Sequence, residues 1–257
     1  MKKILLIFIL GILSGCDTAD APDCLQRTGD IVSRDLVVEP FEELIVYGRI
    51  KLYIEQGTEH KVKVEAGKNL IDNIFVTVEN NRLVLKDKIS CNFIRKYNTT
   101  TVYVTVPNLT WLQNAGNNPL ESIGTLNYPN IWLRSLNQEQ DPEIYTNGDF
   151  KLDLVSNYIR ITTDNYSNFF LTGETNYLNL YIADGDSRIE AGNLVAGTVD
   201  IQHRGTNKLI VNPQEILKGE IRSTGDVIST NQPLEVDIET FYTGKLIFSP
   251  PTPEGGE

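Results

Sequence analysis

Chemically reactive side chains are scarce in this chain of 257 residues, which holds two His, three Cys and one Met. Lys and Arg number 23 against 34 Asp and Glu, so the formal net charge is −11, and we find no basic patch. An acidic surface repels nucleic acid and anionic membrane surfaces, so nucleic acid is excluded as a partner. Little alanine excludes a coiled coil, and 40% hydrophobic residues exclude disorder as the main state.

A single long apolar run lies at the start of the chain, at residues 4–13. These ten residues are too few to span about 30 Å of hydrocarbon, and with Lys2 and Lys3 before them they predict a signal peptide at 1–15. Leu13-Ser14-Gly15-Cys16 resembles the lipobox of bacterial lipoproteins; a plain signal peptide with an incidental Cys is the alternative. We therefore expect a lipid anchor in the outer membrane, with the periplasmic or surface face left open.

The three Cys residues divide between lipid and protein in this interpretation. Cys16 carries the lipid and begins a short acidic tether, residues 16–30. Cys24 and Cys91 remain, in a compartment where disulfides persist, so we predict a bond between them; two unrelated thiols are the alternative. Two thiols and two distant His show no ligand spacing, so we expect no metal or other cofactor.

Short alternating segments broken by Gly, Asn, Asp and Pro fill residues 31–107, as is typical of β-strands. Residues 79–81 separate two of these segments and predict a hairpin turn, because Asn tolerates positive φ. Residues 67–72 favour a single helical turn. Meander or hairpin packing of this less regular section is as compatible with its pattern as further coils of the repeat that follows.

A repeat of about twenty residues governs residues 108–248. A strand that returns at this interval stacks in parallel on its own copy, about 4.8 Å further along an axis. We therefore predict an all-β fold, a right-handed parallel β-helix, followed by a flexible tail at 249–257. An antiparallel sandwich is the alternative, but it would not produce inward columns at this spacing. The columns are Thr110, Ile131 and Leu152; Leu112, Leu133 and Leu154; then Leu178 and Leu180, Val199 and Ile201, and Gly219 and Ile221.

A second column and the turns refine this register. Ile123 and Ile144 lie 21 residues apart, and Ile189 and Leu209 lie 20 apart. Between Leu154 and Leu178 the series needs a few more residues than elsewhere, so we expect a loop that bulges within residues 165–175. The turn glycines Gly185, Gly205 and Gly225 recur every 20 residues.

Several short segments together carry a family likeness. They are Ala21-Pro22-Asp23-Cys24, Leu44-Ile45-Val46, Ile54-Glu55-Gln56-Gly57, Asn80-Asn81-Arg82-Leu83, Cys91-Asn92-Phe93-Ile94-Arg95 and Val104-Thr105-Val106-Pro107-Asn108-Leu109. On these segments the chain resembles the auto-transporter adhesin, head GIN domain family, over roughly residues 22–248. The family's Gly-Ser-Gly-like turns are replaced here, for example by Asn114-Ala115-Gly116-Asn117. The resemblance implies a β-helical fold and brings no established activity.

One candidate surface is a pair of acids. If Ile201 and Ile221 face inward, Asp200 and Glu220 face outward, one above the other. Two carboxylates about 5 Å apart can serve as acid and nucleophile on a polysaccharide or hold a cation. Outward positions of a solenoid are polar in any case, however, and no nucleophile triad or nucleotide fingerprint is present. We therefore expect no enzyme, and we expect His203 at the surface.

Aromatic side chains form the other candidate surface. Trp111 and Trp132 lie 21 apart and should stack on successive coils, on the face opposite to Leu112 and Leu133. Exposed, they form a hydrophobic strip typical of an interface; buried, they pack under the N-terminal section. The tyrosines that can add platforms for sugar or protein are Tyr145, Tyr158, Tyr166, Tyr177 and Tyr181.

These observations lead to one interpretation of the whole chain. We expect a cell-envelope lipoprotein whose partners are the membrane, through the lipid anchor, and an unidentified glycan or protein ligand bound by the β-helix in adhesion. A polysaccharide-acting β-helix enzyme and a structural subunit of an envelope complex are the alternatives.

Overall fold

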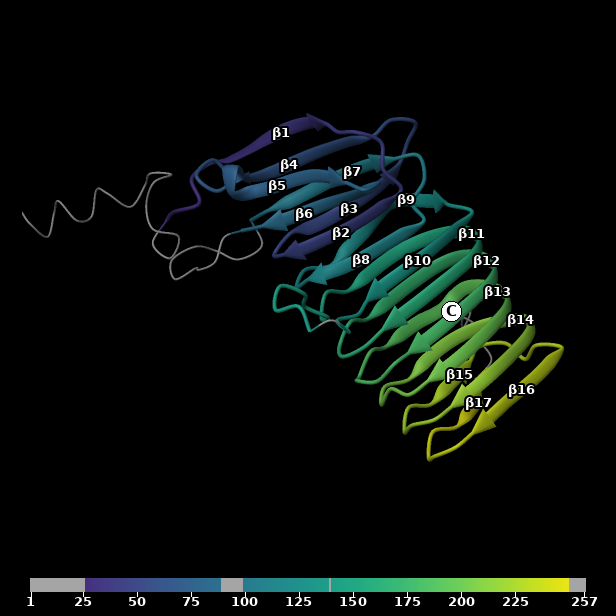
Figure 1. Cartoon of the computed structure of the whole chain (residues 1–257). Coiled ribbons are helices and arrows are strands. Elements are labelled where there is room, and N and C mark those ends of the chain that lie inside the picture. The colour runs from purple at the N-terminus through teal and green to yellow at the C-terminus, as the bar shows by residue number, and fades with distance from the viewer. Residues whose placement is uncertain (1–25, 89–98, 139, 250–257) are drawn as a thin grey trace, which may run out of the picture.

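The chain folds almost entirely into β-strands. The computed structural model describes residues 26–88, 99–138 and 140–249, and these contain seventeen strands and one helical turn, η1 (Ile71–Asn73). Figure 1 shows the strands stacked side by side in an elongated, curled body. The all-β prediction is therefore confirmed.

The N-terminal section combines hairpins with parallel strands. Asn80 and Asn81, with φ of 50° and 66°, form the predicted turn between antiparallel β5 and β6. β4 runs antiparallel to β1 and β7, whereas β2 lies parallel between β6 and β8, and β3 lies parallel between β7 and β9. The strands of this section are β1 (Ile31–Val37), β2 (Glu43–Gly48), β3 (Lys51–Gln56), β4 (Lys61–Gly67), β5 (Ile74–Glu79), β6 (Arg82–Asp87) and β7 (Thr101–Val106).

The remaining strands stack in parallel and cover two faces. The first face contains β6, β2, β8, β10, the second halves of β11 to β14, and β16. The second face contains β7, β3, β9, the first halves of β11 to β14, and then β15 and β17. These later strands are β8 (Trp111–Gly116), β9 (Leu120–Asn127), β10 (Asn130–Ser135), β11 (Phe150–Thr163), β12 (Phe169–Ile182), β13 (Ile189–His203), β14 (Leu209–Ile221), β15 (Val227–Ser229), β16 (Glu235–Thr240) and β17 (Leu246–Phe248).

Apolar side chains from successive strands form continuous columns inside the body. On the second face the rings of Phe150 and Phe169 stack 4.4 Å apart, and both side chains are fully buried. This column passes from the N-terminal section into the repeat without a break, so the two sections share one core. Its members are Val102, Leu52, Leu120, Phe150, Phe169, Ile189, Leu209, Val227 and Leu246.

The predicted register is right in places and wrong in others. Leu112 pairs with Leu133, and Ile189 with Leu209, as expected. Leu133 pairs with Ile161, however, and Leu154 lies on the second face beside Leu126. Ile123 and Ile144 do not share a column, because Ile123 lies in β9, whereas Ile144 lies in no strand and packs against the cluster that contains Trp111. At the far end the prediction is displaced by two residues, since Ile201 pairs with Gly219 rather than Ile221.

The extra residues lie elsewhere than predicted. Within the predicted range, residues 165–168 form the short turn before β12, and residues 169–175 do not bulge, because β11 and β12 pair in continuous register from Phe150 and Phe169 to Ser156 and Thr175. The irregular segment lies between β10 and β11, where the described residues 136–138 and 140–149 form no strand. The Asn137 side chain holds it by donating to the carbonyls of Asp141 and Ile144, at 2.9 and 3.2 Å. A polar segment fixed by its own hydrogen bonds leaves no periodic apolar signal.

Stacked turns close one edge of the repeat. The Gly225 amide donates to the Gly205 carbonyl at 3.3 Å, and the Thr206 amide donates to the Gly185 carbonyl at 2.8 Å, so the predicted spacing of the turn glycines is confirmed. His203 lies beneath these turns and is 0% exposed, which corrects its predicted surface position. The glycines leave room for its ring, because a Cβ on Gly225 would lie 2.3 Å from Nε2.

Several expectations fall outside the described residues. These are the signal peptide, Cys16 and the start of the tether, the Cys24–Cys91 disulfide, and most of the C-terminal tail. Each stays a prediction. Within residues 26–88, 99–138 and 140–249, no helix has the length and apolar character needed to cross a membrane.

Candidate functional site

Arginine and tryptophan side chains alternate across the outer side of the first face. The Arg82 guanidinium carbon lies 4.1 Å from the centre of the Trp111 ring, and Arg134 lies 5.5 Å from the same ring. Arg134 and Arg160 both stack on Trp132, at 4.7 and 4.5 Å. We call these five residues the Arg–Trp ladder. The predicted pairing of the two tryptophans is confirmed, because Trp111 lies opposite Trp132 in the parallel register of β8 and β10.

The ladder is held in place from both ends. Glu43 accepts a hydrogen bond from Arg82 Nε at 2.8 Å, and the Trp132 indole N–H donates to Thr162 Oγ1 at 2.9 Å. Stacking of a guanidinium on an indole contributes roughly 0.5–2 kcal/mol and fixes the plane of the guanidinium. The rings lie against the guanidiniums, the Nε atoms of Arg134 and Arg160 are buried, and Glu43 engages Arg82.

The two tryptophans differ in burial. Trp111 is 7% exposed and packs with Ile45 and Ala115, so it lies under the N-terminal section. Trp132 is half-buried at the edge of the same cluster. Neither forms the bare hydrophobic strip that full exposure would give, since arginines cover their faces. What the surface offers is therefore rigid cationic groups on an aromatic base.

Two tyrosines extend the first face beyond the ladder. Tyr158 and Tyr177 stack 5.6 Å apart on β11 and β12. The Tyr177 hydroxyl donates to Asp200 Oδ2 at 2.7 Å. Burial, followed by this hydrogen bond and the charge of Asp200, raises the pKa of Tyr177 to about 12, so the hydroxyl remains a donor throughout the physiological range.

The predicted pair of acids does not form. Asp200 pairs with Lys218 on β14, while Glu220 pairs with Gln202. Glu220 instead makes an ion pair with Arg222, and the hydrogen bond from Arg222 holds the pKa of Glu220 below its usual value. Each acid thus has a local partner, and the two-residue register shift is the reason that they are not stacked. Among the described residues, no group of three or more His, Cys, Asp or Glu could hold a metal ion.

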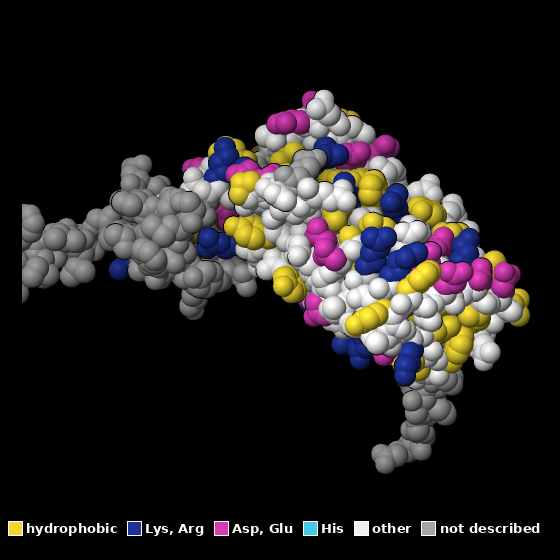
Figure 2. All heavy atoms as spheres, turned by 60° about the horizontal axis from the view of Figure 1, so that its bottom comes forward, with side chains coloured by type: hydrophobic (Ala, Val, Ile, Leu, Met, Phe, Trp, Pro, Cys, Tyr) yellow, Lys and Arg dark blue, Asp and Glu magenta, His cyan; other side chains and the backbone are white. Residues whose placement is uncertain are grey.

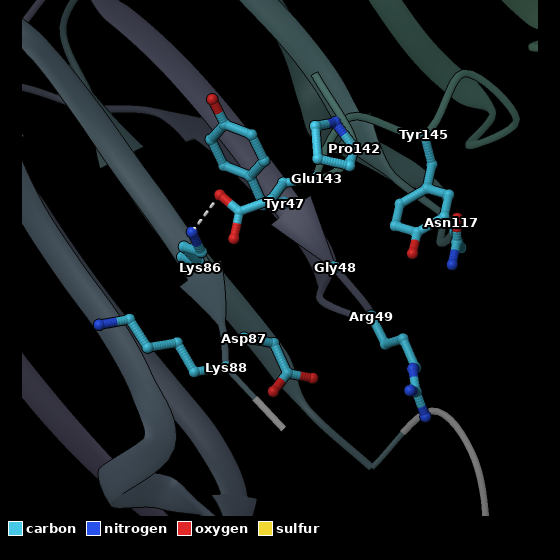
Figure 3. Close-up of a pocket in the computed structure, with 10 residues that line it drawn as sticks. All are labelled: Tyr47, Gly48, Arg49, Lys86, Asp87, Lys88, Asn117, Pro142, Glu143 and Tyr145. Carbon is cyan, nitrogen blue, oxygen red and sulfur yellow. Dashed lines mark hydrogen bonds and ion pairs between the residues drawn. The ribbon is translucent and has the colours of Figure 1, made fainter. Parts of the chain in front are cut away.

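A pocket of about 440 Å³ lies where β2 and β6 end near the irregular segment. Figure 3 shows Lys86 and Glu143 facing each other beside Tyr47, with Arg49 and Tyr145 further along the wall. Lys86 and Glu143 form an ion pair. The pocket therefore presents fixed charges of both signs, which suits a small polar group rather than an apolar one.

The surface as a whole mixes side-chain types. Figure 2 shows basic and hydrophobic side chains interspersed on the face in view, with a short row of acidic side chains on the right, the side on which Figure 1 draws β16. Exposed acids on β16 are Glu235, Asp237 and Glu239. The cationic ladder is thus a local exception on a chain of net charge −11.

The arginines of the ladder are the residues that sequence reasoning missed. A signal was present, because Arg134 follows Trp132 by two positions and alternate residues of a strand share one face. Arg82 and Arg160 could not be found in this way. Arg82 reaches Trp111 from a hairpin strand, and Arg160 is brought opposite Trp132 only by the irregular 28-residue step between the two.

The comparisons with known proteins agree on the fold. A solved structure from Bacteroides fragilis NCTC 9343, described as an adhesin, superposes with a TM-score of 0.76 at 19% identity, over 86% of this chain and 99% of that chain. An adhesin from Parabacteroides merdae ATCC 43184 gives 0.57 at 14% identity, over 86% and 98%. A structure from Parabacteroides distasonis ATCC 8503, described as a lipid binding protein, gives 0.56 at 13% identity, over 88% and 97%. No curated protein matches the chain.

A family model assigns the chain more directly. It carries the description "Putative auto-transporter adhesin, head GIN domain" and matches residues 40–233. The matched range includes most of both faces and all five residues of the ladder. The chain therefore belongs to the auto-transporter adhesin, head GIN domain family.

Proposed function

We propose that this protein is a cell-envelope lipoprotein that binds acidic ligands through the Arg–Trp ladder in adhesion. The adhesin-like family supports an envelope or surface location. Attachment through Cys16 to the outer membrane is part of the proposal and rests on the lipobox-like Leu13-Ser14-Gly15-Cys16. The ligand class rests on the chemistry of the first face.

The observation that carries the proposal is the double stacking of Arg134 and Arg160 on Trp132. Stacked guanidiniums lose little further freedom when they bind, and their forked N–H groups match carboxylate, sulfate or phosphate oxygens in a bidentate manner. A glycan or protein with acidic groups has the matching chemistry.

We also infer that the stacked strands wind as a right-handed parallel β-helix from β11 onward. The support is the parallel register of β11, β12, β13 and β14, with the next strand pairs laid on both halves of β14. Parallel crossovers are right-handed in nearly all proteins. Such a body suits binding, because it presents a long outer surface held by a single core.

The side-chain partners of Asp200 and Glu220 favour binding over catalysis. Asp200 is engaged by Tyr177 and Glu220 by Arg222, so this part of the surface does not present the paired carboxylates that glycoside hydrolysis uses. We therefore propose a protein that binds its ligand without transforming it.

The test is a glycan array bearing carboxylated, sulfated and neutral glycans. The purified chain is expected to bind acidic glycans, more weakly at high salt. Arg134→Gln combined with Arg160→Gln should weaken that binding by about tenfold or more, because charged hydrogen bonds are lost. Lys151→Gln combined with Lys245→Gln is the matched control, since it removes two exposed cations from the second face.

Two outcomes would contradict the proposal. One is that the arginine and lysine double variants weaken the binding of acidic glycans equally, because the effect would then follow from net charge alone. The other is the absence of any acidic ligand together with recovery of a stable envelope complex that the arginine variant does not disturb. That result would favour the structural-subunit alternative.

A further inference from the structure

A second concavity lies where the long strands bend from the second face to the first. It is a groove of about 550 Å³ that crosses β11, β12, β13 and β14 near their middles and begins at the end of β9. Amide side chains line it repeatedly, and its charged side chains are two carboxylates, Glu174 and Glu215. Its other lining residues include Asn127, Asn157, Asn176 and Gln214.

The amides of the groove follow the stacking of the strands. Asn176 Nδ2 donates to Asn157 Oδ1 at 3.3 Å, from one strand to the next. Neighbouring strands lie about 4.8 Å apart, and the groove has an amide side chain on β9, β11, β12 and β14, whereas β13 contributes Val195 and Gly197. The bend places these amides on the outside. Alternate residues are buried up to Ser156, and burial resumes at Ile159, so the two residues between them both face outward.

A buried hydroxyl in the wall of the groove lacks a partner. Ser156 is 8% exposed, and its Oγ makes no hydrogen bond within the described part of the chain. Leaving a buried hydroxyl unpaired is unfavourable, so such a group in a native wall requires an explanation. A hydroxyl delivered from the groove, after a small adjustment of the wall, would remove this cost.

Stacked aromatic rings stand next to the groove. Tyr158 and Tyr177 are the residues that follow Asn157 and Asn176, and their rings lie 5.6 Å apart. Amides and carboxylates that exchange hydrogen bonds with hydroxyls, beside flat aromatic surface, form a combination suited to sugars. With Glu174 and Glu215 as its charged groups, the groove would repel acidic ligands.

We propose that this groove binds a linear, uncharged glycan whose chain lies along the stacking axis. The inference rests on the proposed function in treating the protein as an adhesin, but it uses a different surface and a different ligand class. A sugar chain repeats its hydroxyls along its length, and the groove presents amides on four of the five strands that line it, so several sugar residues of one chain meet similar hydrogen-bonding groups. An extended peptide is the other occupant that the test must separate.

The experiment measures binding of soluble neutral glucans, xylans and mannans of increasing length, in both anomeric series, by calorimetry. Affinity should rise with chain length until the groove is filled and should change little with salt. Asn157→Ala combined with Asn176→Ala should weaken binding by about tenfold or more. Asn193→Ala combined with Gln202→Ala removes two exposed amides outside the groove and should leave binding unchanged.

Thermal unfolding of both double variants separates loss of the site from loss of the fold, and both should unfold close to the unchanged chain. The inference is overturned if no neutral glycan binds, if the two double variants weaken binding equally, or if only extended peptides bind. Arg134→Gln combined with Arg160→Gln should leave neutral-glycan binding intact. Failure of the ladder and failure of the groove are therefore distinguishable.

Discussion

At the scale of single residues, His203 shows how the turns hold a polar ring inside the body. Its Nε2 lies 2.9 Å from the Asn207 carbonyl, and the Gly205 amide donates to Nδ1 at 3.3 Å. The neutral ring with a proton on Nε2 satisfies both contacts. Burial lowers the pKa of His203, so the charged form is disfavoured in the folded protein.

This pKa shift predicts a pH dependence of stability. Below about pH 6.5, the ordinary pKa of His, the His203 ring binds a proton in the unfolded chain but not in the folded one. The free energy of unfolding therefore falls as pH decreases toward the lower pKa of His203 in the folded protein. His203→Gln should flatten the pH dependence of thermal unfolding in that window. Equal slopes for the unchanged chain and His203→Gln would contradict the assignment.

Position 219 lies in the core column of the first face, and its backbone geometry requires glycine. Its φ is +123°, and a Cβ there would lie 2.0 Å from the Ile201 carbonyl oxygen. Gly219→Ala should therefore lower the free energy of unfolding by about 2 kcal/mol or more. Gly124→Ala is the control, because φ is +71° there but no atom lies within 4 Å of the added Cβ. It should cost about 1 kcal/mol, and denaturant titration that finds equal losses would refute the role of close approach.

At the scale of elements, the columns decide which positions tolerate charge. Leu180 lies fully buried between Ile161 and Ile201, whereas Leu234, just before β16, is 91% exposed. Leu180→Asp should cost more than about 3 kcal/mol or prevent folding, because it buries an unpaired carboxylate. Leu234→Asp should stay within about 0.5 kcal/mol. Similar unfolding midpoints for the two variants would be incompatible with this packing.

The elements also show what a sequence can reveal about this fold. Alternation and turn residues predict the β5–β6 hairpin, and the 21-residue interval predicts the pairing of Trp111 with Trp132. The step from β10 to β11 could not be predicted, because the irregular segment between these strands is held by local polar contacts such as those of Asn137. The displacement of Asp200 and Glu220 has a separate cause, because the register between β13 and β14 shifts again between Ala196 and Thr198.

The candidate site was also predictable only in part from the periodic pattern. The sequence indicates an aromatic face, and the structure adds the arginines that cover it. The groove could not be foreseen, since it depends on the change of parity at the bend of β11, beside Ser156. Periodicity within one strand says nothing of where a strand turns a corner.

At the scale of the whole molecule, the chain joins a predicted anchor to a continuous body. Cys16→Ala should release the protein from the membrane into the soluble fraction, because the acyl chains contribute most of the membrane affinity. Fractionation followed by immunoblotting measures this. Asp17→Ala is a control that should keep the membrane-bound pool. A Cys16→Ala variant that remains in the membrane to the same extent would contradict lipid anchoring.

The central claim is that this body binds ligands on two separate outer surfaces. One glycan array probed with the unchanged chain, the Arg134→Gln/Arg160→Gln variant and the Asn157→Ala/Asn176→Ala variant tests it most directly. The arginine variant should lose acidic glycans and keep neutral ones, and the asparagine variant should do the reverse. Binding patterns that are identical for all three proteins would contradict it.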